Sequence, residues 1–286
     1  MWVADGWKDY GLLDATDGMR LERWGKYILA RPDPQVLWKT GKNHPGWQNP
    51  DAAYKRSSQG GGEWSRHSLP EKWNVGYGDL SFAVRPMNFK HMGLFPEQSP
   101  NWDAARKLIS SRVQAGKEVK LLNLFAYTGA ATAACAKAGA KVTHVDAAKG
   151  MVAAAGENAM LNGVQARWIV EDCRSFIARE LRRGNRYDAI IMDPPSYGRG
   201  PGGEIWRLED DMFDFIKLCA GLLSGDAAFV FVNAYTTGLA PGVLTYMLET
   251  LITPNFGGSA EAGELGLPVG DTRLILPCGA TGRWIR

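Results

Sequence analysis

The chain has 286 residues, of which 45% are hydrophobic and 22% are charged, so it can bury a large core in one big domain or in two smaller ones. This composition excludes a disordered chain and a coiled coil. The net charge of +3 is too small to indicate a nucleic-acid binder by itself. Eight of the eleven tryptophans precede residue 103, which indicates two parts with different roles.

The first hundred residues have the short, strand-like patterns of a small β-rich domain. Asp17-Gly18 lies between two apolar runs, which predicts a β-hairpin. Residues 39–63 are rich in glycine, proline, asparagine and serine, which predicts a flexible insertion. Strand alternation resumes at 73–77 and 80–84. We therefore predict a small β-rich domain over residues 1–93, with substrate recognition as its expected role. Its tryptophans form either a base-stacking surface or, as we favour, the core of the domain.

From residue 119 onward strands and helices alternate, which is typical of a parallel sheet with crossover helices. The expected strands are 119–124, 141–146, 167–171, 187–192 and 227–233. The expected helices are 102–114, 129–138, 149–162, 174–183, 207–223 and 241–251. A closing pair of strands is expected at 264–267 and 273–277. The pattern predicts an α/β, Rossmann-like domain over residues 94–286.

Ligands of such a sheet bind beyond the carboxyl ends of the strands, so the residues just after each strand form the candidate site. The first strand leads into Asn123-Leu-Phe-Ala-Tyr-Thr-Gly129, a tight turn whose amides can point at a ligand. Asp146 ends the second strand, where a carboxylate can accept both hydroxyls of an adenosine ribose. A solvated aspartate or a cap of the following helix is the alternative for Asp146. Glu171-Asp172-Cys173 ends the third strand, where an acceptor can read an adenine amino group. Asp193-Pro-Pro-Ser-Tyr197 follows the fourth.

These segments also distinguish between cofactors. A nicotinamide oxidoreductase would have G-x-G-x-x-G in the first turn, which contains Gly129 alone. An acid after the second strand, an acid after the third and Asp-Pro-Pro after the fourth instead resemble class I S-adenosylmethionine-dependent methyltransferases. The resemblance narrows to the bacterial branch related to the 23S ribosomal RNA methyltransferases and covers nearly the whole chain. The segments that carry it are Arg31–Gln35, His91–Gln98, Leu121–Gly129, Asp193–Tyr197 and Leu276–Gly279.

This resemblance implies a seven-stranded methyltransferase sheet, S-adenosylmethionine as cofactor and RNA, in particular ribosomal RNA, as substrate. It also implies that the segment with Phe95 and Gln98 lies beside the cofactor as a lid. Taken with the strand ends, the expected cofactor-binding residues are Phe95, Gln98, Asn123, Phe125, Ala126, Tyr127, Thr128, Gly129, Asp146, Ala147, Asp172, Cys173 and Asp193. The expected catalytic residues are Asp193, Pro194, Pro195 and Tyr197.

The segments after the fourth and fifth strands bear on which atom is methylated. Methylation of cytosine C5 needs a thiolate that adds to the ring, and neither the loop at Ser196 nor residues 232–236 contain a cysteine. Transfer to a base nitrogen needs an aligned lone pair, which the loop at Asp193 can orient while Tyr197 stacks on an extruded base. Ser196 departs from the amino-methylating pattern, in which the aromatic residue follows the second proline directly. Buried structural thiols are expected for Cys135, Cys173, Cys219 and Cys278.

Three functions remain open at this point: methylation of RNA, methylation of a protein or small molecule, and S-adenosylmethionine binding without turnover. The cysteine spacing matches neither a zinc site nor a dense disulfide framework, so no metal is expected. The first residues have no signal-peptide pattern, and no stretch reaches the roughly 18 apolar residues of a membrane span. These features predict a cytoplasmic protein without a membrane partner.

Overall fold

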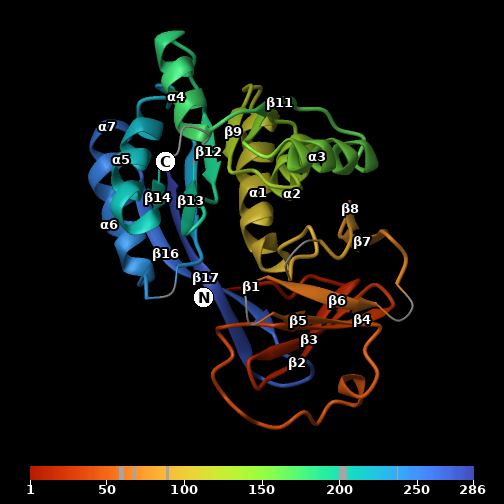
Figure 1. The fold of residues 1–286 in the computed structure, drawn as a ribbon. Helices are drawn as coiled ribbons and strands as arrows, with labels where there is room; N and C mark the ends of the chain where they lie inside the picture. Colours follow the sequence, from red (N-terminus) through yellow and green to blue (C-terminus); the bar gives the residue numbers. More distant parts are fainter. Residues whose placement is uncertain (58–60, 67–68, 88–89, 200–204, 237) are drawn as a thin grey trace. The chain divides into compact units, whose positions relative to one another are not determined.

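The computed structural model describes residues 1–286 except 58–60, 67–68, 88–89, 200–204 and 237 (Figure 1). It contains two compact units, which are described one at a time. The first comprises Met1–Pro100 and Leu265–Cys278, and the second comprises Asn101–Glu264 and Gly279–Arg286. The division expected from the sequence, at residue 93 alone, differs because residues 265–278 pair with N-terminal residues, as in the pairs Trp2↔Leu265 and Leu12↔Val269.

The first unit is built on a five-stranded sheet with the order β2-β3-β4-β5-β6. Its strands are β2 (Tyr10–Thr16), β3 (Met19–Trp24), β4 (Tyr27–Pro32), β5 (Ala52–Arg56) and β6 (Gly62–Arg66). The expected hairpin is confirmed: Asp17 and Gly18 join β2 to β3 with φ of 53° and 71°, as a type I′ turn requires. A second pair, β7 (Trp73–Tyr77) and β8 (Leu80–Val84), has the expected bounds. The short strand β1 (Trp2–Val3) pairs with β16.

Within the predicted flexible insertion at 39–63, of which 58–60 lie outside the described residues, Ala52–Arg56 form β5. This strand runs parallel to β4 and antiparallel to β6. Ala52 and Tyr54 are buried, and the residue between them is partly exposed, so the period of two is present. Glycine and proline on both sides concealed this short strand in the sequence. The 3-10 helix η1 (Pro45–Trp47) also lies within the insertion.

The N-terminal tryptophans serve mainly as structural residues of the first unit. Trp24 is completely buried. Five others donate the indole N–H to a carbonyl or carboxylate of the same unit: Trp7, Trp38, Trp47, Trp64 and Trp73. Because all five rings are fixed by hydrogen bonds and all but the exposed Trp38 are half-buried, the core function favoured from the sequence accounts for them better than a base-stacking surface does.

The second unit is an α/β sandwich around a mostly parallel sheet. The strands are β9 (Lys120–Leu124), β10 (Lys141–Asp146), β11 (Arg167–Val170), β12 (Ala189–Met192) and β15 (Phe229–Ala234), together with β16 (Ser259–Pro268) as far as Glu264 and β17 (Ile275–Ile285) from Gly279. Their order is β16-β17-β15-β12-β9-β10-β11, with β1 beyond β16 and β17 antiparallel to β15. These seven strands confirm the predicted Rossmann-like sheet. β12 and β15 are buried along their whole length because helices cover both faces.

Helices pack on both faces of this sheet (Figure 1). They are α1 (Ser99–Gln114), α2 (Ala130–Lys137), α3 (Lys149–Leu161), α4 (Cys173–Arg182), α5 (Leu208–Ala220), α6 (Pro241–Leu251) and α7 (Thr253–Phe256). One apolar cluster joins α4, α5 and α6 to the sheet through residues such as Phe176, Phe215 and Leu248. A separate cluster joins α1 and α2 to the sheet through Ile109 and Cys135.

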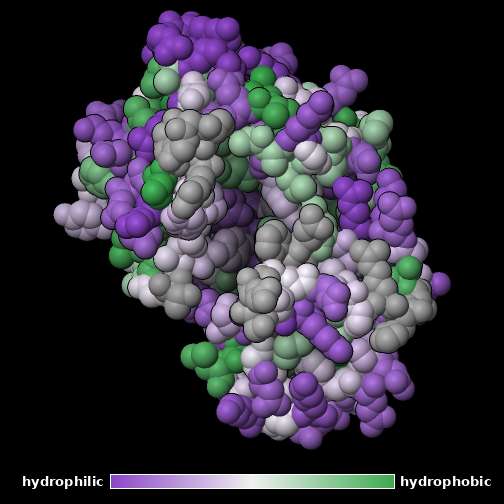
Figure 2. All heavy atoms as spheres, in the orientation of Figure 1, coloured by the Kyte–Doolittle hydropathy of each residue, from purple (hydrophilic) through white to green (hydrophobic). Residues whose placement is uncertain are grey.

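The C-terminal strands are longer than expected, since β16 and β17 extend well beyond 264–267 and 273–277. β17 pairs with β15 from Ala234↔Ala280 to Phe229↔Ile285. Gly279 and Gly282 interrupt the apolar pattern there, so the local sequence does not reveal a strand that its distant partner stabilises. In the described part of the chain, no helix has the length and apolarity needed to cross a membrane. The face drawn in Figure 2 is mostly hydrophilic, with scattered hydrophobic side chains.

Candidate functional site

Four neighbouring parallel strands bring the expected segments to one edge of the sheet in the second unit. β9 ends at Leu124, β10 at Asp146, β11 at Val170 and β12 at Met192. The pairing places Leu124 beside Met192, and Asp146 beside Val170. The residues after these strands therefore lie next to one another, at the edge where ligands of such sheets bind.

The turn after β9 has a strained backbone. Phe125 and Tyr127 have φ of 52° and 51°, a region that residues other than glycine rarely enter. β10 holds the turn: the Ala126 N–H donates to the Val145 carbonyl at 3.1 Å, and the Tyr127 N–H donates to Asp146 Oδ2 at 2.9 Å. Such strain costs on the order of 1–3 kcal/mol per residue and is found mainly at functional sites.

Thr128 and Gly129 end this turn and pack against α3. The Thr128 side chain is buried, and its carbonyl accepts a hydrogen bond from Asn158 Nδ2 at 2.8 Å. Gly129 has a φ of 78°, and a Cβ added there would lie 2.7 Å from the Cβ of Ala155. Only glycine therefore satisfies both the backbone conformation and the close approach of α3.

We expect Gly129→Ala to lower the free energy of unfolding by about 2–4 kcal/mol, through strain and overpacking together. Gly163→Ala is the matched control, because Gly163 has a φ of 64° with nothing within 4 Å of the added Cβ. The control should lose only about 1 kcal/mol, from strain alone. Urea unfolding of both variants measures the difference, and equal losses would contradict the close contact with α3.

Asp146 is half-buried and orders the backbone on both sides of it. Its Oδ2 accepts the Tyr127 N–H at 2.9 Å, and its Oδ1 accepts the Ala148 N–H at 2.8 Å. Burial raises the pKa of this carboxyl, although the two amide hydrogen bonds oppose the rise. Ala147 between them is exposed. Ala148 is itself the N-cap of α3, which has no side-chain cap, so Asp146 orders the backbone before the helix and does not cap it. Contact of Asp146 with a ribose stays a prediction.

A buried chain of hydrogen bonds lies beneath the turn. Asn123 Nδ2 donates to Thr132 Oγ1 at 2.9 Å, and Thr132 Oγ1 lies 2.9 Å from His144 Nδ1. The His144 ring is fully buried and lies 5.0 Å from the ring of Trp168. Burial lowers the pKa of His144 to about 4, so the imidazole is neutral near pH 7. The Asn123 side chain thus points into the interior, supporting the turn from below.

The neutral state of His144 predicts a pH dependence of stability. Because its pKa falls from 6.5 to about 4 on folding, the unfolded chain takes up this proton at higher pH than the folded chain. His144 is therefore without effect above about pH 6.5 and destabilises the fold progressively as the pH falls toward about 4, by about 2–4 kcal/mol in total. We expect His144→Asn to lose less unfolding free energy than the wild type between about pH 7 and pH 4.5.

Urea unfolding at the two pH values measures this difference. His91, whose pKa burial and the nearby Arg31 also lower to about 4, contributes equally to both proteins and cancels in the comparison. An identical decline in the wild type and the variant would show that His144 does not titrate as a buried neutral group.

Asp172 and Cys173 begin α4. The Asp172 carboxylate accepts the Ser175 N–H at 2.9 Å and caps the helix. Cys173 is buried, and its Sγ accepts the Phe125 N–H at 3.3 Å, a further bond to the strained turn. Both side chains therefore have structural roles, and recognition of adenine at this position stays a prediction.

All four cysteines are buried, as predicted. Burial raises the pKa of every thiol, to about 12 for Cys135. Buried, protonated thiols are poor nucleophiles.

The Asp-Pro-Pro segment follows β12 directly. The Asp193 N–H donates to the Leu124 carbonyl at 3.3 Å, which joins this segment to the end of β9. Asp193 is half-buried, Pro194 is buried and Pro195 is exposed. The Tyr197 side chain is 53% exposed, so its ring is accessible for stacking. The catalytic roles assigned to these residues stay predictions.

Two contacts of this segment were missed from the sequence. Thr236 Oγ1, after β15, donates to Ser196 Oγ at 2.8 Å. Trp206 Nε1 donates to the Pro195 carbonyl at 2.6 Å. In the sequence, the signal for the Trp206 contact was a single tryptophan beside a glycine-rich stretch.

Phe95 and Gln98 belong to the first unit. The Phe95 ring lies 5.6 Å from the His91 ring in an edge-to-face arrangement. Gln98 ends the 3-10 helix η2 (Pro96–Gln98) and is buried, and the Pro96 carbonyl accepts the indole N–H of Trp7 at 3.0 Å. The segment is thus fixed within its own unit, and its contact with a cofactor stays a prediction.

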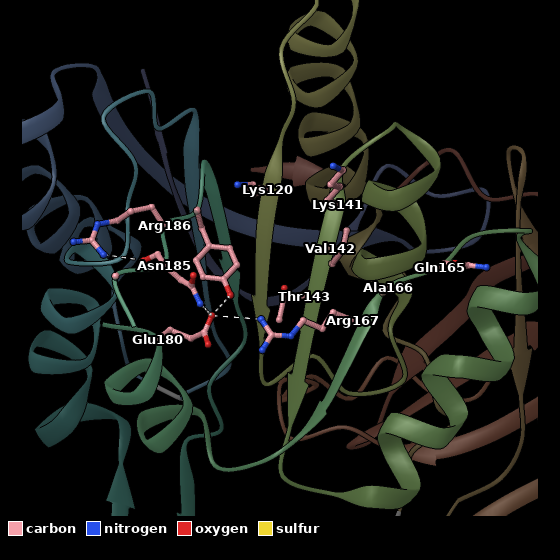
Figure 3. A pocket seen from close by; sticks show the side chains of 12 residues that line it. Lys120, Lys141, Val142, Thr143, Gln165, Ala166, Arg167, Glu180, Asn185 and Arg186 are labelled. Atoms are coloured by element: carbon pink, nitrogen blue, oxygen red, sulfur yellow. Dashed lines mark hydrogen bonds and ion pairs between the residues drawn. The ribbon is translucent and has the colours of Figure 1, made fainter. Parts of the chain in front are cut away.

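A groove of about 720 Å³ lies at the opposite, amino-terminal ends of the strands (Figure 3). Arg167 of β11 lies 3.5 Å from the buried Glu180 of α4, and the Tyr187 hydroxyl donates to the same carboxylate at 2.8 Å. Lys120 and Lys141, on the rim, pair with Glu118. Because these charges are paired internally and lie away from the carboxyl ends, we assign them a structural role. Within the described ranges, His, Cys, Asp and Glu side chains form no group of three suited to a metal ion.

Comparison with known proteins identifies the family. Residues 51–239 match the family model described as S-adenosylmethionine-dependent methyltransferase. The chain belongs to this family. It is 36% identical to the S-adenosylmethionine-dependent methyltransferase from Agrobacterium tumefaciens, whose crystal structure superposes with a TM-score of 0.91 over 99% of this chain and 92% of that one. The predicted family, fold and cofactor are thereby confirmed.

Two curated relatives of this methyltransferase are named ribosomal RNA large subunit methyltransferase K/L. The protein from Allochromatium vinosum is 32% identical over 212 residues, which are 72% of this chain and 26% of the relative. The protein from Syntrophotalea carbinolica is 31% identical over 170 residues, 58% of this chain and 22% of the relative. The chain thus spans about a quarter of their length. A Streptococcus mutans methyltransferase structure, 19% identical with a TM-score of 0.69 over 98% of this chain and 76% of that one, shares the fold.

Proposed function

We propose that this methyltransferase modifies RNA, in particular ribosomal RNA, at a base nitrogen by direct transfer without a cysteine nucleophile. The observation that carries the proposal is the Asp193-Pro-Pro segment, hydrogen-bonded to the end of β9 at the edge that also holds the strained turn and Asp146. That edge combines an acceptor-orienting loop with a backbone suited to close approach of a ligand.

The residues at this edge fit S-adenosylmethionine. The strained turn from Phe125 to Gly129 would approach the cofactor through its backbone, Asp146 would accept the ribose hydroxyls, and Asp172 would read the adenine. Bound S-adenosylmethionine supplies an electrophilic methyl group on a sulfonium. Ala147, Cys173, Phe95 and Gln98 complete the proposed set.

The acceptor is proposed to meet the loop after β12. There the Asp193 carboxylate would accept a hydrogen bond from a base amino group, orienting the nitrogen lone pair toward the methyl group. Tyr197, with its exposed ring, would stack on the extruded base. Direct transfer is supported by the burial of all four thiols, because addition to a pyrimidine ring needs an accessible thiolate.

An RNA substrate is supported by the names of the curated relatives, which match 58% and 72% of this chain. We propose residues 1–93 for substrate recognition, and residues 94–286 for S-adenosylmethionine binding and methyl transfer.

Mass spectrometry of ribosomal RNA nucleosides from cells with and without the gene tests the proposal. We expect one N-methylated nucleoside to disappear on deletion and to return when purified protein and tritiated S-adenosylmethionine are added to RNA from the deletion strain. Label in protein or metabolites alone would assign another substrate. Cofactor binding without any transfer would indicate a module that binds S-adenosylmethionine without turnover.

A further inference from the structure

The hairpin that follows the Asp-Pro-Pro segment folds back onto it. Its strands, β13 (Tyr197–Arg199) and β14 (Ile205–Arg207), pair in antiparallel register with Gly198 opposite Trp206. The Leu208 N–H donates to the Ser196 carbonyl at 3.1 Å and closes the base of the hairpin. Trp206 is therefore held beside the loop by backbone pairing.

The indole of Trp206 makes two kinds of contact at this position. Its Nε1–H donates to the Pro195 carbonyl at 2.6 Å. Its ring lies 5.8 Å from the ring of Phe125 and 5.4 Å from that of Phe215, centroid to centroid. Phe125 is a strained residue of the turn after β9, and Phe215 is buried on α5. The Trp206 side chain thus links the Asp193-Pro-Pro segment, the turn after β9 and the apolar core around Phe215.

We propose that Trp206 is a positioning residue, which locks the Asp193-Pro-Pro loop against the turn after β9 and fixes the orientation of the Pro195 carbonyl. The inference rests on the proposed function, since it specifies how the acceptor loop is held. The indole N–H uses one of the two lone pairs of the Pro195 carbonyl, and this bond fixes the Pro195–Ser196 peptide plane.

Holding the loop in this way is expected to affect mainly the rate of methyl transfer. Displacements of about 1 Å at an acceptor can lower the rate about a hundredfold without weakening cofactor binding. Trp206→Phe keeps an aromatic ring and removes the N–H, whereas Trp206→Leu removes both. We expect kcat to fall about tenfold in the first and about a hundredfold in the second, with the Kd for S-adenosylmethionine within about twofold of the wild type in both.

The matched control is Trp284→Phe. Trp284 Nε1 also donates to a backbone carbonyl of the second unit, that of Gly257, at 2.9 Å. Trp284 lies on β17 and not beside the Asp193-Pro-Pro segment. The control removes an equivalent bond away from the loop, so it should leave kcat unchanged even if it lowers the melting temperature. Unchanged kcat in Trp206→Phe, or an equal loss in Trp284→Phe, would overturn the proposal.

Hydrogen exchange gives a readout that does not depend on the substrate. Peptides covering 193–199 should exchange about tenfold faster in Trp206→Phe than in the wild type and the Trp284→Phe control. Unchanged exchange in Trp206→Phe would overturn the lock, even if the wild type proved active on RNA. Conversely, if the wild type transfers no methyl group to RNA while exchange accelerates as expected, the proposed function fails and the lock stands.

Discussion

Replacing Asp193 with alanine is expected to lower the kcat of methyl transfer about a hundredfold or more, while the protein stays folded. Removing one preorganised group that meets the reacting atoms typically has an effect of this size in enzymes. Asp193 is held where it can act: its N–H bonds to the Leu124 carbonyl, and two prolines follow it and restrict the backbone. Single-turnover assays with tritiated S-adenosylmethionine and RNA from a deletion strain measure the effect.

The matched control for Asp193 is Asp210→Ala. Asp210 is an exposed acid on α5 whose ion pair with Arg207 is long, at 4.0 Å, so its loss should change neither activity nor stability appreciably. Circular dichroism and thermal melting verify the fold of both variants. Normal turnover in Asp193→Ala would remove this carboxylate from the mechanism, whatever the substrate proves to be.

Asp146→Ala is expected to weaken S-adenosylmethionine binding about 10- to 100-fold, the equivalent of about 1.5–3 kcal/mol. Two effects add. The variant would lose the acceptor proposed for the ribose hydroxyls, and it would release the Tyr127 and Ala148 amides that the carboxylate now holds. Isothermal titration calorimetry measures the Kd directly, and unchanged affinity would show that the ribose site lies elsewhere.

The protonation of Asp146 offers a second test of the same site. Because burial raises the pKa of this carboxyl, its proton binds at higher pH than that of a free aspartate. Wild-type affinity should therefore decline as the pH is lowered into the acidic range, since the protonated group loses acceptor strength. Asp146→Asn should bind more weakly than the wild type at neutral pH and lack that decline. A parallel pH profile in both proteins would assign the titration to another group.

Elements whose signals are local were predicted well from the sequence. β10 and α6 have the expected bounds, because a buried apolar run and a proline at the helix start identify each without reference to other segments. The Asp17-Gly18 hairpin was predicted for the same reason. β5 and most of β17 were not, because their stability comes from pairing with β4, β6 and β15.

The same distinction between local signals and tertiary contacts applies to the candidate site. The sequence by itself determined the family, the sheet and the positions of Asp146, Asp172 and Asp193 at strand ends, because the parallel strands β9 to β12 bring their carboxyl ends to one edge. Only the tertiary structure decided what each polar group does there. It shows that Asn123 bonds to Thr132, Asp172 caps α4 and the Pro195 carbonyl accepts from Trp206. A hydrogen bond depends on atoms within about 3 Å in space, and sequence spacing does not encode that distance.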